Sequence, residues 1–167
     1  MKSPKLELRF YKISDAARVF KLVTNPRFKY FNASAKTVQD EINWIKTNVA
    51  KRKNNLEWNF AILRSREIVG GIGIKINQQR PYIGEIGYFV GEEYWSQGIA
   101  TQAVKLVEKI GFTKLKLSRI EILMRPENKA SEKVARKNGY KKEGLLKRVI
   151  KDRENKFHNS YLYAKVL

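Results

Sequence analysis

The chain has 167 residues, a length that suits one domain with a substantial buried core. It has no cysteine and a single histidine, His158, which excludes disulfides and thiol catalysis and disfavours a zinc site or a histidine-centred triad. With 35 lysines and arginines against 16 aspartates and glutamates, the formal charge is +19, which favours polyanionic neighbours such as ribosomes or other RNA. A solvated surface typical of the host proteome is the alternative.

Neither the N-terminus nor any other segment carries the apolar run of a targeting sequence or a membrane span, so we expect a cytoplasmic protein with no membrane partner. In the first half of the chain, periodicity and turn signals predict a strand at Leu6–Tyr11, a helix capped by Ser14 or Asp15, a helix capped by Thr37, and strands at Trp58–Leu63, Ile68–Ile76 and Tyr82–Val90. In the second half, they predict a helix from Gly98 to about Phe112, a strand at Arg119–Met124, a short helix at Ala130–Lys137, and strands at Tyr140–Lys147 and Phe157–Val166.

This pattern predicts a single α/β (α+β) domain with a mixed, mostly antiparallel, twisted sheet flanked by helices. The helix after Thr37 carries the apolar residues Val38, Ile42, Trp44, Ile45 and Val49. The aromatic residues Phe28, Tyr30, Phe31 and Trp44 are expected to lie in the core rather than to line a binding cleft.

Residues 82–101 are the most informative stretch, because they predict a buried strand, a turn, a glycine-containing loop and a helix start. Backbone N–H groups at such a helix start lack intrahelical partners and lie at the positive end of the helix dipole, so they bind anions, most plausibly a pyrophosphate. The loop has neither a Walker sequence nor the three-glycine dinucleotide fingerprint, which disfavours nucleotide hydrolysis and hydride transfer. The residues expected to supply these N–H groups are Gln97, Gly98, Ile99, Ala100 and Thr101.

Three stretches occur in an order and spacing that fit jointly: Glu85-Ile-Gly-Tyr88 with Tyr94-Trp-Ser-Gln-Gly-Ile-Ala-Thr-Gln-Ala103, Arg119-Ile-Glu-Ile with Pro126-Glu-Asn-Lys-Ala-Ser131, and Lys137-Asn-Gly-Tyr140 with Glu143-Gly144. Over essentially the whole chain this arrangement resembles the GNAT superfamily of acetyl-CoA-dependent N-acetyltransferases. Within it, the likeness is to the RimJ/RimL-like branch, which acetylates N-terminal amines of ribosomal proteins.

Two positions depart from the usual pattern of that superfamily. The pyrophosphate signature Gln/Arg-x-x-Gly-x-Gly/Ala begins here with Trp95, a departure that the RimJ/RimL-like branch shares. A tyrosine general acid commonly follows the loop asparagine by seven residues, but counting from Asn128 reaches Ala135. The branch offers a serine three residues after that asparagine, and here this serine is Ser131.

Glu85 is the leading candidate for the general base, because it lies mid-strand just before the cofactor loop and shares a strand face with Gly87 and Phe89. Partial burial there would raise the pKa of its carboxyl group toward a useful value. The alternative is an ordinary solvent-facing glutamate.

The resemblance implies roles for several further residues. Backbone N–H groups near Phe89 and Val90 would polarise the thioester carbonyl, Asn128 would hydrogen-bond the pantetheine arm, and Ser131 would protonate the departing thiolate. Arg136 and Lys133 would reach the cofactor phosphates. The alternatives are a turn asparagine, a serine in the first helical turn, and a solvated helix face.

The expected function is acetyl transfer from acetyl-CoA to a primary amine, most plausibly a protein N-terminal α-amine, in a ternary complex without metal, by a monomer or homodimer. An α-amine, with a pKa of about 8, loses its proton far more readily than lysine, with a pKa of about 10.4. Polyamines and aminoglycosides are rival acceptors, but a +19 protein repels them unless a local acidic cleft exists, for which Glu57, Glu85, Glu92 and Glu93 are the obvious contributors. A non-catalytic acyl-CoA- or RNA-associated module is the rival from another class.

Overall fold

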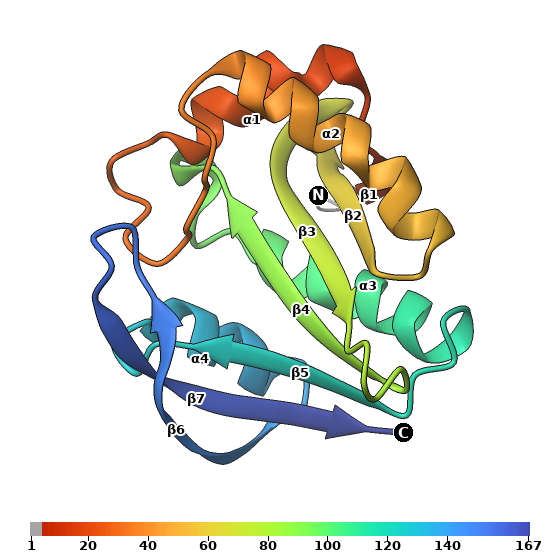
Figure 1. Cartoon of the computed structure of the whole chain (residues 1–167), viewed down its shortest axis with the longest axis vertical. Helices are drawn as coiled ribbons and strands as arrows, with labels where there is room; N and C mark the ends of the chain where they lie inside the picture. The colour runs from red at the N-terminus through yellow and green to blue at the C-terminus, as the bar shows by residue number, and fades with distance from the viewer. Residues whose placement is uncertain (1–4) are drawn as a thin grey trace.

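The computed structural model describes residues 5–167 and contains one seven-stranded sheet with helices on both faces (Figure 1). The strands are β1 (Leu6–Phe10), β2 (Glu57–Arg64), β3 (Glu67–Ile76), β4 (Ile83–Val90), β5 (Arg119–Met124), β6 (Lys141–Lys151) and β7 (Phe157–Val166). The helices are α1 (Ala16–Val23), α2 (Val38–Lys53), α3 (Ile99–Thr113) and α4 (Lys129–Lys137), with short 3-10 turns η1 (Ile13–Asp15) and η2 (Glu92–Tyr94). The predicted fold class and every predicted helix and strand are confirmed.

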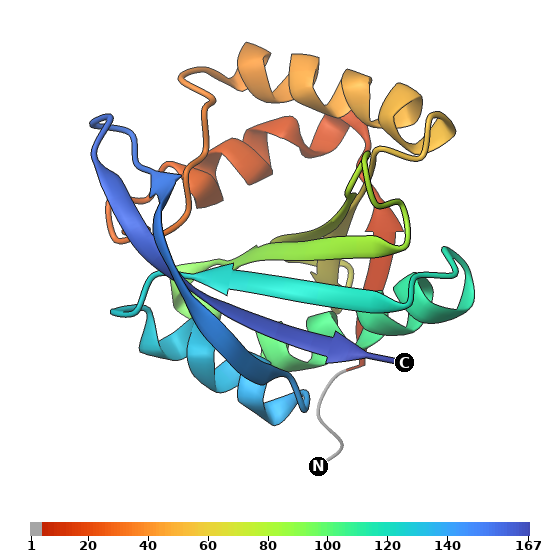
Figure 2. The same ribbon diagram turned by 60° about the horizontal axis from the view of Figure 1, so that its bottom comes forward.

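The sheet order is β1-β2-β3-β4-β5-β7-β6, and all neighbouring strands are antiparallel except β4 and β5. The parallel β4–β5 ladder is short: it pairs only Ile83 with Arg119, Gly84 with Ile120, and Glu85 with Glu121. Beyond Glu85 the two strands diverge, while β5 stays paired with β7 along its whole length (Figure 2). The carboxyl ends of β4 and β5 therefore enclose a V-shaped opening.

Because successive side chains of a strand point to opposite faces of the sheet, the strands build one hydrophobic core on each face. On one face, Ile86 of β4 packs with α3 residues such as Val104 and Val107. On the other face, Phe89 of β4 packs with Val19 and other residues of α1. Each such buried aliphatic or aromatic side chain contributes about 1.5–3 kcal/mol relative to exposure, which fixes the orientation of β4 between the two helix layers.

The entry to α1 differs from the predicted cap. The chain reaches α1 through η1, and the side chain of Asp15 forms no cap hydrogen bond with the helix. Its carboxylate instead accepts hydrogen bonds from the Arg9 guanidinium, at 2.6 and 2.9 Å, and from the backbone N–H of Lys12, at 2.7 Å. Asp15 thus ties β1 to the start of the helical layer.

Helix α2 begins where the sequence predicts, but it is rotated relative to its apolar pattern. Thr37 and Asp40 form a reciprocal capping box at its start. The side chains of Glu41, Ile45 and Asn48 face the sheet and are buried, whereas Val49 is 63% exposed. These three buried positions are spaced i, i+4, i+7, so they share one helical face. Of the two polar residues, Glu41 borders a cleft, and Asn48 accepts a hydrogen bond of 3.0 Å from the side chain of Asn59. None of the helices within residues 5–167 is long and apolar enough to cross a membrane.

Candidate active site

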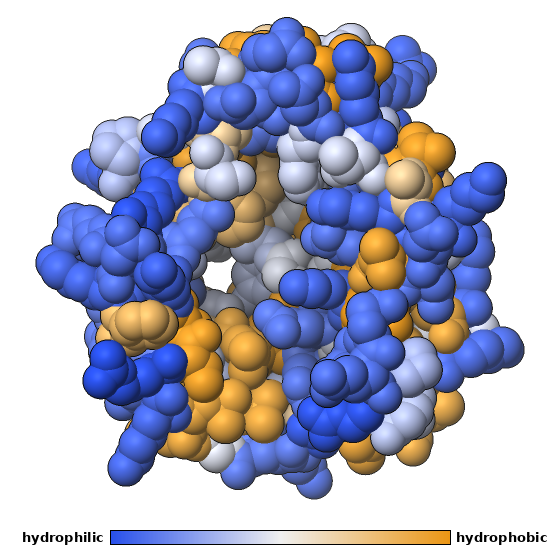
Figure 3. Space-filling view, viewed as in Figure 1, coloured by the Kyte–Doolittle hydropathy of each residue, from blue (hydrophilic) through white to orange (hydrophobic). Residues whose placement is uncertain are grey.

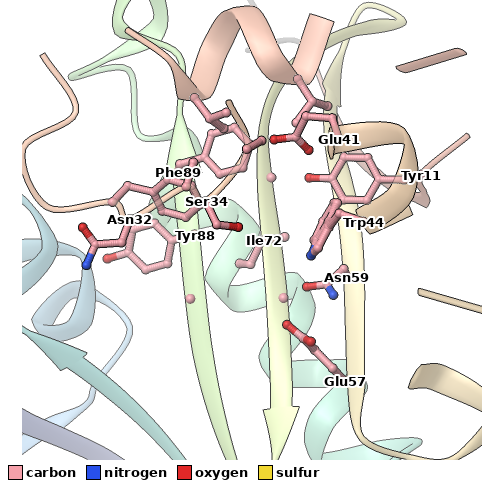
Figure 4. Close-up of a pocket in the computed structure, with 18 of the residues that line it drawn as sticks. Tyr11, Asn32, Ser34, Glu41, Trp44, Glu57, Asn59, Ile72, Tyr88 and Phe89 are labelled. Carbon is pink, nitrogen blue, oxygen red and sulfur yellow. The ribbon is translucent and has the colours of Figure 1, made fainter. Parts of the chain in front are cut away.

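Two clefts meet at the carboxyl end of β4. The larger, about 890 Å³, occupies the opening between β4 and β5 and is bordered by residues 27–31, the start of α3 and one face of α4. The smaller, about 320 Å³, lies between the α1–α2 layer and strands β2, β3 and β4 (Figure 4). Both clefts are lined by Phe31, Gly87, Tyr88 and Phe89, and a space-filling view shows the molecule hollowed near its centre (Figure 3).

The start of α3 forms one end of the larger cleft, as the sequence predicts. Gly98 has φ 75°, a left-handed conformation that turns the chain into the helix, and the first i→i−4 bond runs from the N–H of Gln102 to the carbonyl of Gly98 at 3.1 Å. The N–H groups of Ile99, Ala100 and Thr101 precede that bond, and these residues line the cleft. The arrangement is suited to an anion.

Trp95 and Gln97 hold this loop in place from its two sides. The indole Nε1 of Trp95 donates a hydrogen bond of 2.7 Å to the carbonyl oxygen of Val90, which attaches the loop to the end of β4. The Gln97 side chain turns away from the larger cleft, accepts a hydrogen bond from Arg64 and donates one to the carbonyl of Glu93. Gln97 does not line the larger cleft, so only its backbone N–H remains a candidate for the anion.

On α4, the cleft-facing cations differ from those predicted. Lys133 and Lys137 line the larger cleft. Arg136, expected at the cofactor phosphates, does not line it; its guanidinium donates to the Tyr163 hydroxyl at 3.2 Å and to Glu132 at 3.1 Å. The reason is helical phase, since each residue turns by about 100° and Arg136 lies about 160° from Val134, which is at the middle of the cleft-lining positions of α4.

Asn128 and Ser131 both line the larger cleft. Asn128 is the N-cap of α4, and its Oδ1 accepts a hydrogen bond of 3.1 Å from the backbone N–H of Ser131. This contact gives Asn128 a clear structural role.

The sequence interpretation missed Tyr88, which supplies a phenol where the family's usual tyrosine is absent. Its hydroxyl lies 2.7 Å from the Oγ of Ser131. Burial raises the pKa of Tyr88 to about 12, although the Ser131 hydrogen bond acts in the opposite direction. The hydroxyl therefore keeps its proton at neutral pH and can donate it. Tyr88 stands in the motif Glu85-Ile-Gly-Tyr88, but only the tertiary approach of β4 and α4 reveals its partner.

Glu85 lies on the smaller cleft, at the last position where β4 pairs with β5. The Glu85 side chain is exposed at the cleft surface. The protein atoms around the cleft nevertheless desolvate its carboxyl group, and this desolvation raises the pKa of Glu85. Lys75, its cross-strand neighbour on β3, opposes the shift, and Glu121 on β5 adds to it. The predicted direction of this pKa shift is confirmed.

Phe89 and Val90 line the larger cleft at the end of β4, beyond the last β4–β5 pair. Of the four aromatic residues expected in the core, Phe28 and Phe31 pack against Phe89 and also line the larger cleft. Tyr30 lines the larger cleft and Trp44 the smaller one, so the core prediction is wrong for both. The rings of Phe28, Tyr30 and Phe31 lie at the larger cleft because the 28–31 connection borders it, whereas Trp44 lines the smaller cleft from α2.

A family model for the acetyltransferase (GNAT) domain matches residues 5–141. The chain belongs to the GNAT acetyltransferase family. The GNAT domain is 31% identical over 148 residues to the N-acetyltransferase p20 of Bacillus licheniformis, covering 86% of this chain and 83% of p20. It is 29% identical over 154 residues to the N-acetyltransferase YoaA of Bacillus subtilis, covering 90% and 87%.

Solved GNAT structures align over nearly the whole chain. RimJ of Mycobacterium smegmatis, in complex with CoA-disulfide, has a TM-score of 0.88 and 25% identity, covering 96% of this chain and 81% of RimJ. RimL, a ribosomal L7/L12 alpha-N-protein acetyltransferase in complex with coenzyme A, has a TM-score of 0.88 and 22% identity, covering 99% and 96%. The resemblance to the RimJ/RimL-like branch is confirmed.

The protein is thus an acetyl-CoA-dependent N-acetyltransferase, and the larger cleft fits this cosubstrate. Its N–H donors at the start of α3 and its cations Lys133 and Lys137 suit phosphates, while its apolar wall at Phe28 and Val134 suits the pantetheine arm. Within residues 5–167, no cluster of three or more histidine, aspartate or glutamate side chains is arranged to hold a metal ion.

Proposed function

We propose that this GNAT enzyme acetylates the α-amine of a protein N-terminus. One observation carries the proposal: Glu85 and Tyr88, the partner of Ser131, lie three positions apart on β4, at the point where the two clefts join. A base on the acceptor side and a proton donor on the cofactor side match the two proton transfers that amine acetylation needs.

Acetyl-CoA supplies the acetyl group as a thioester. On the acceptor side, Glu85 removes a proton from the ammonium form of the amine, directly or through one water. The backbone N–H of Val90, beyond the last β4–β5 pair, stabilises negative charge on the carbonyl oxygen, whereas the strand register directs the N–H of Phe89 to Gly71 of β3. On the cofactor side, the Tyr88 hydroxyl or the Ser131 hydroxyl donates the proton that the departing thiolate needs. The new C–N bond forms as the C–S bond of the thioester breaks. Starting from the ammonium form, the amine loses two protons in all: one is balanced by the proton that coenzyme A gains, and the other is released to solvent.

An α-amine suits this base better than a lysine side chain does. Deprotonating lysine at pH 7.5 opposes a pKa of about 10.4, whereas an α-amine opposes one of about 8. Even with a raised pKa, the Glu85 carboxylate has a smaller pKa gap to overcome with an α-amine than with a lysine. RimL, which shares this fold, is an alpha-N-protein acetyltransferase, and this supports the same acceptor.

A small polycationic amine is the second candidate, because the smaller cleft is acidic. Of the expected contributors, Glu57 and Glu85 line this cleft, and Asp40 and Glu41 join them. Glu92 and Glu93 do not, since they pair with Arg27 and Arg18. A local acidic cleft removes the objection that a +19 protein repels polycations.

The decisive experiment is a coenzyme A thiol-release assay over three acceptors at matched concentration. They are a peptide with a free N-terminus, the same peptide blocked at the N-terminus but carrying an internal lysine, and spermidine. The proposal expects the highest kcat/KM for the free N-terminus. A higher kcat/KM for spermidine or the internal lysine overturns the acceptor, and release from none of the three favours a non-catalytic acyl-CoA-binding module.

The surface charge supports an acceptor presented near RNA. Eleven basic and four acidic residues lie within residues 129–156, which include α4 at the cofactor cleft. An N-terminus on a ribosomal protein would place the reaction in the cytoplasm. Counterion release makes such attraction steeply salt-dependent, so co-sedimentation with ribosomes should decrease strongly between 50 and 200 mM salt. Co-sedimentation that is absent at low salt removes ribosome proximity from the proposal.

A further inference from the structure

Glu41 on α2 is a buried carboxylate without a partner. It is 6% exposed, and its side chain forms no hydrogen bond or ion pair with any residue in the range 5–167. The two other buried carboxylates of that range are fully engaged: Asp15 pairs with Arg9, and Glu132 pairs with Lys129, Arg136 and the Tyr163 hydroxyl. Glu41 therefore differs from every comparable group, in a chain with 35 lysines and arginines.

Stabilisation of helix α2 does not explain why the Glu41 side chain is buried. A carboxylate near the start of a helix is stabilised by the helix dipole, but that effect requires no burial. Asp40, which is exposed, already caps α2 through the backbone N–H groups of Lys36 and Thr37, both at 2.8 Å. The Glu41 oxygens still reach the cleft, but the side chain as a whole is largely desolvated, and holding a carboxylate there without a partner costs free energy in the isolated protein.

The Glu41 carboxylate points into the smaller cleft. In Figure 4 it faces the middle of the cavity beside the Tyr11 hydroxyl, with the Trp44 ring below them. The Tyr11 and Trp44 rings meet edge to face, with centroids 5.2 Å apart. Gly71 makes room for this arrangement, because a Cβ there would lie 2.1 Å from the Tyr11 hydroxyl. A carboxylate, a phenol oxygen and two aromatic rings are the groups that bind organic cations.

The other charges of the cleft do not satisfy Glu41. Among residues 5–167, Lys75 is the only basic residue that lines the cleft, and in strand register it lies between Glu57 and Glu85. Glu57 also pairs with Lys51 at 2.9 Å. The negative charge of Glu41 thus remains available to a ligand.

We propose that Glu41 binds a second positively charged group of the acceptor while the reacting amine lies at Glu85. The inference rests on the proposed function for the identity of the reacting amine, but the subsite itself is defined by ammonium or guanidinium chemistry. In a protein acceptor this group is the side chain of a lysine or arginine among the first few residues. In a small acceptor it is a second amine.

The test compares acceptors that differ by one charge. Free N-terminal peptides carry lysine or norleucine at position two or three, and 1,4-diaminobutane is compared with butylamine. For the better lysine position, we expect at least about a tenfold advantage in kcat/KM over norleucine, mainly through a lower KM. Glu41→Gln should bring this ratio close to one, while Glu7→Gln, which removes an exposed charge on β1 outside the cleft, should leave it unchanged.

The outcomes separate the subsite from the proposed acceptor. Equal kcat/KM for lysine and norleucine at both positions, with no diamine advantage, overturns the subsite while leaving N-terminal acetylation intact. A ratio that survives in Glu41→Gln also overturns it. A diamine advantage that Glu41→Gln abolishes, with poor activity on every peptide, supports the subsite and overturns the protein acceptor. Thermal unfolding checks the fold: Glu41→Gln should unfold at or above the wild-type temperature, since it removes a buried unpaired charge.

Discussion

The Tyr88 hydroxyl on β4 and the Ser131 hydroxyl on α4 lie 2.7 Å apart, and this contact joins the two elements that enclose the cofactor cleft. Either oxygen can be the donor of the hydrogen bond. In the proposed mechanism, this pair carries a proton from Tyr88 through Ser131, or from Tyr88 directly, to the departing thiolate.

If the two hydroxyls act as one unit, their removal should be non-additive. We expect Tyr88→Phe and Ser131→Ala each to lower kcat by less than about 10²-fold, because a thiolate with a pKa near 8.5 needs little protonation to depart. The double variant should be little worse than the more damaging single one. Single-turnover measurements on the four proteins give the cycle, and strictly multiplicative losses would mean that the two hydroxyls act separately.

Glu85→Gln should reduce turnover by about 10²–10⁴ at neutral pH, with much less change in acetyl-CoA affinity. Since the pKa of Glu85 is raised, the acid limb of the wild-type kcat/KM profile should lie above the ordinary glutamate range. The loss in the variant should shrink at higher pH, where the acceptor deprotonates unaided. If Glu85→Gln keeps the wild-type kcat/KM at neutral pH, Glu85 is not the general base. A larger loss of turnover in Ser131→Ala than in Glu85→Gln would mean that Ser131 contributes more to catalysis than Glu85 does.

Gly98→Val should weaken acetyl-CoA binding through backbone strain. The added Cβ meets only Gln102 Nε2 at 4.0 Å, so the obstacle is the φ of 75° rather than protein crowding. In a thermal-shift titration, ligand at 100 times its Kd stabilises the wild type by about 2.7 kcal/mol, and the variant should require more ligand for the same shift. Gly98→Asn, which tolerates left-handed φ, is the matched control and should bind better than the valine variant. Equal affinity in Gly98→Val would place the anion elsewhere.

Gly87→Val should block the junction of the two clefts without unfolding the protein. A Cβ at Gly87 meets nothing within 4 Å, so the side chain extends into open space between Glu85 and Phe89. We expect kcat/KM for the amine to fall at least about tenfold by loss of the aligned geometry, and unfolding to be unchanged or slightly improved. Gly144→Val on β6 is the control, because its Cβ is equally unobstructed and it lines neither cleft. Full activity in Gly87→Val would show that transfer occurs away from this junction.

Lys137→Gln should raise the KM for acetyl-CoA several-fold, whereas Arg136→Gln should leave it near the wild-type value. The two cations are adjacent on α4, but only Lys137 faces the cofactor cleft, while Arg136 is bound to Glu132 and Tyr163. Initial rates at varied acetyl-CoA, with the amine saturating, measure the difference. A larger effect from Arg136→Gln would restore the assignment made from the sequence alone.

Local patterns predicted the elements and the parts of the site that depend on one segment. Thr37 begins α2, Gly98 precedes α3, and Ser131 lies in the first turns of α4 on the cleft side. Each of these features follows from capping, turn chemistry or helical phase within a few residues.

The missed features depend on how separate elements pack. Tyr88 gains its role from Ser131, 43 residues away. The apolar pattern of α2 predicts a face near Val49, but the polar cleft sets the rotation that buries Glu41 instead. Charge counting could not distinguish Arg136 from Lys137, because only the position of α4 against β7 decides which of the two meets the cofactor cleft.

The three-residue ladder between β4 and β5 ends at Glu85, two residues before Gly87, which lines both clefts. In the proposed reaction, the amine becomes a neutral amide that no longer attracts the Glu85 carboxylate. The reaction itself therefore removes the positive charge that favours acceptor binding, and this change favours release of the acetylated product.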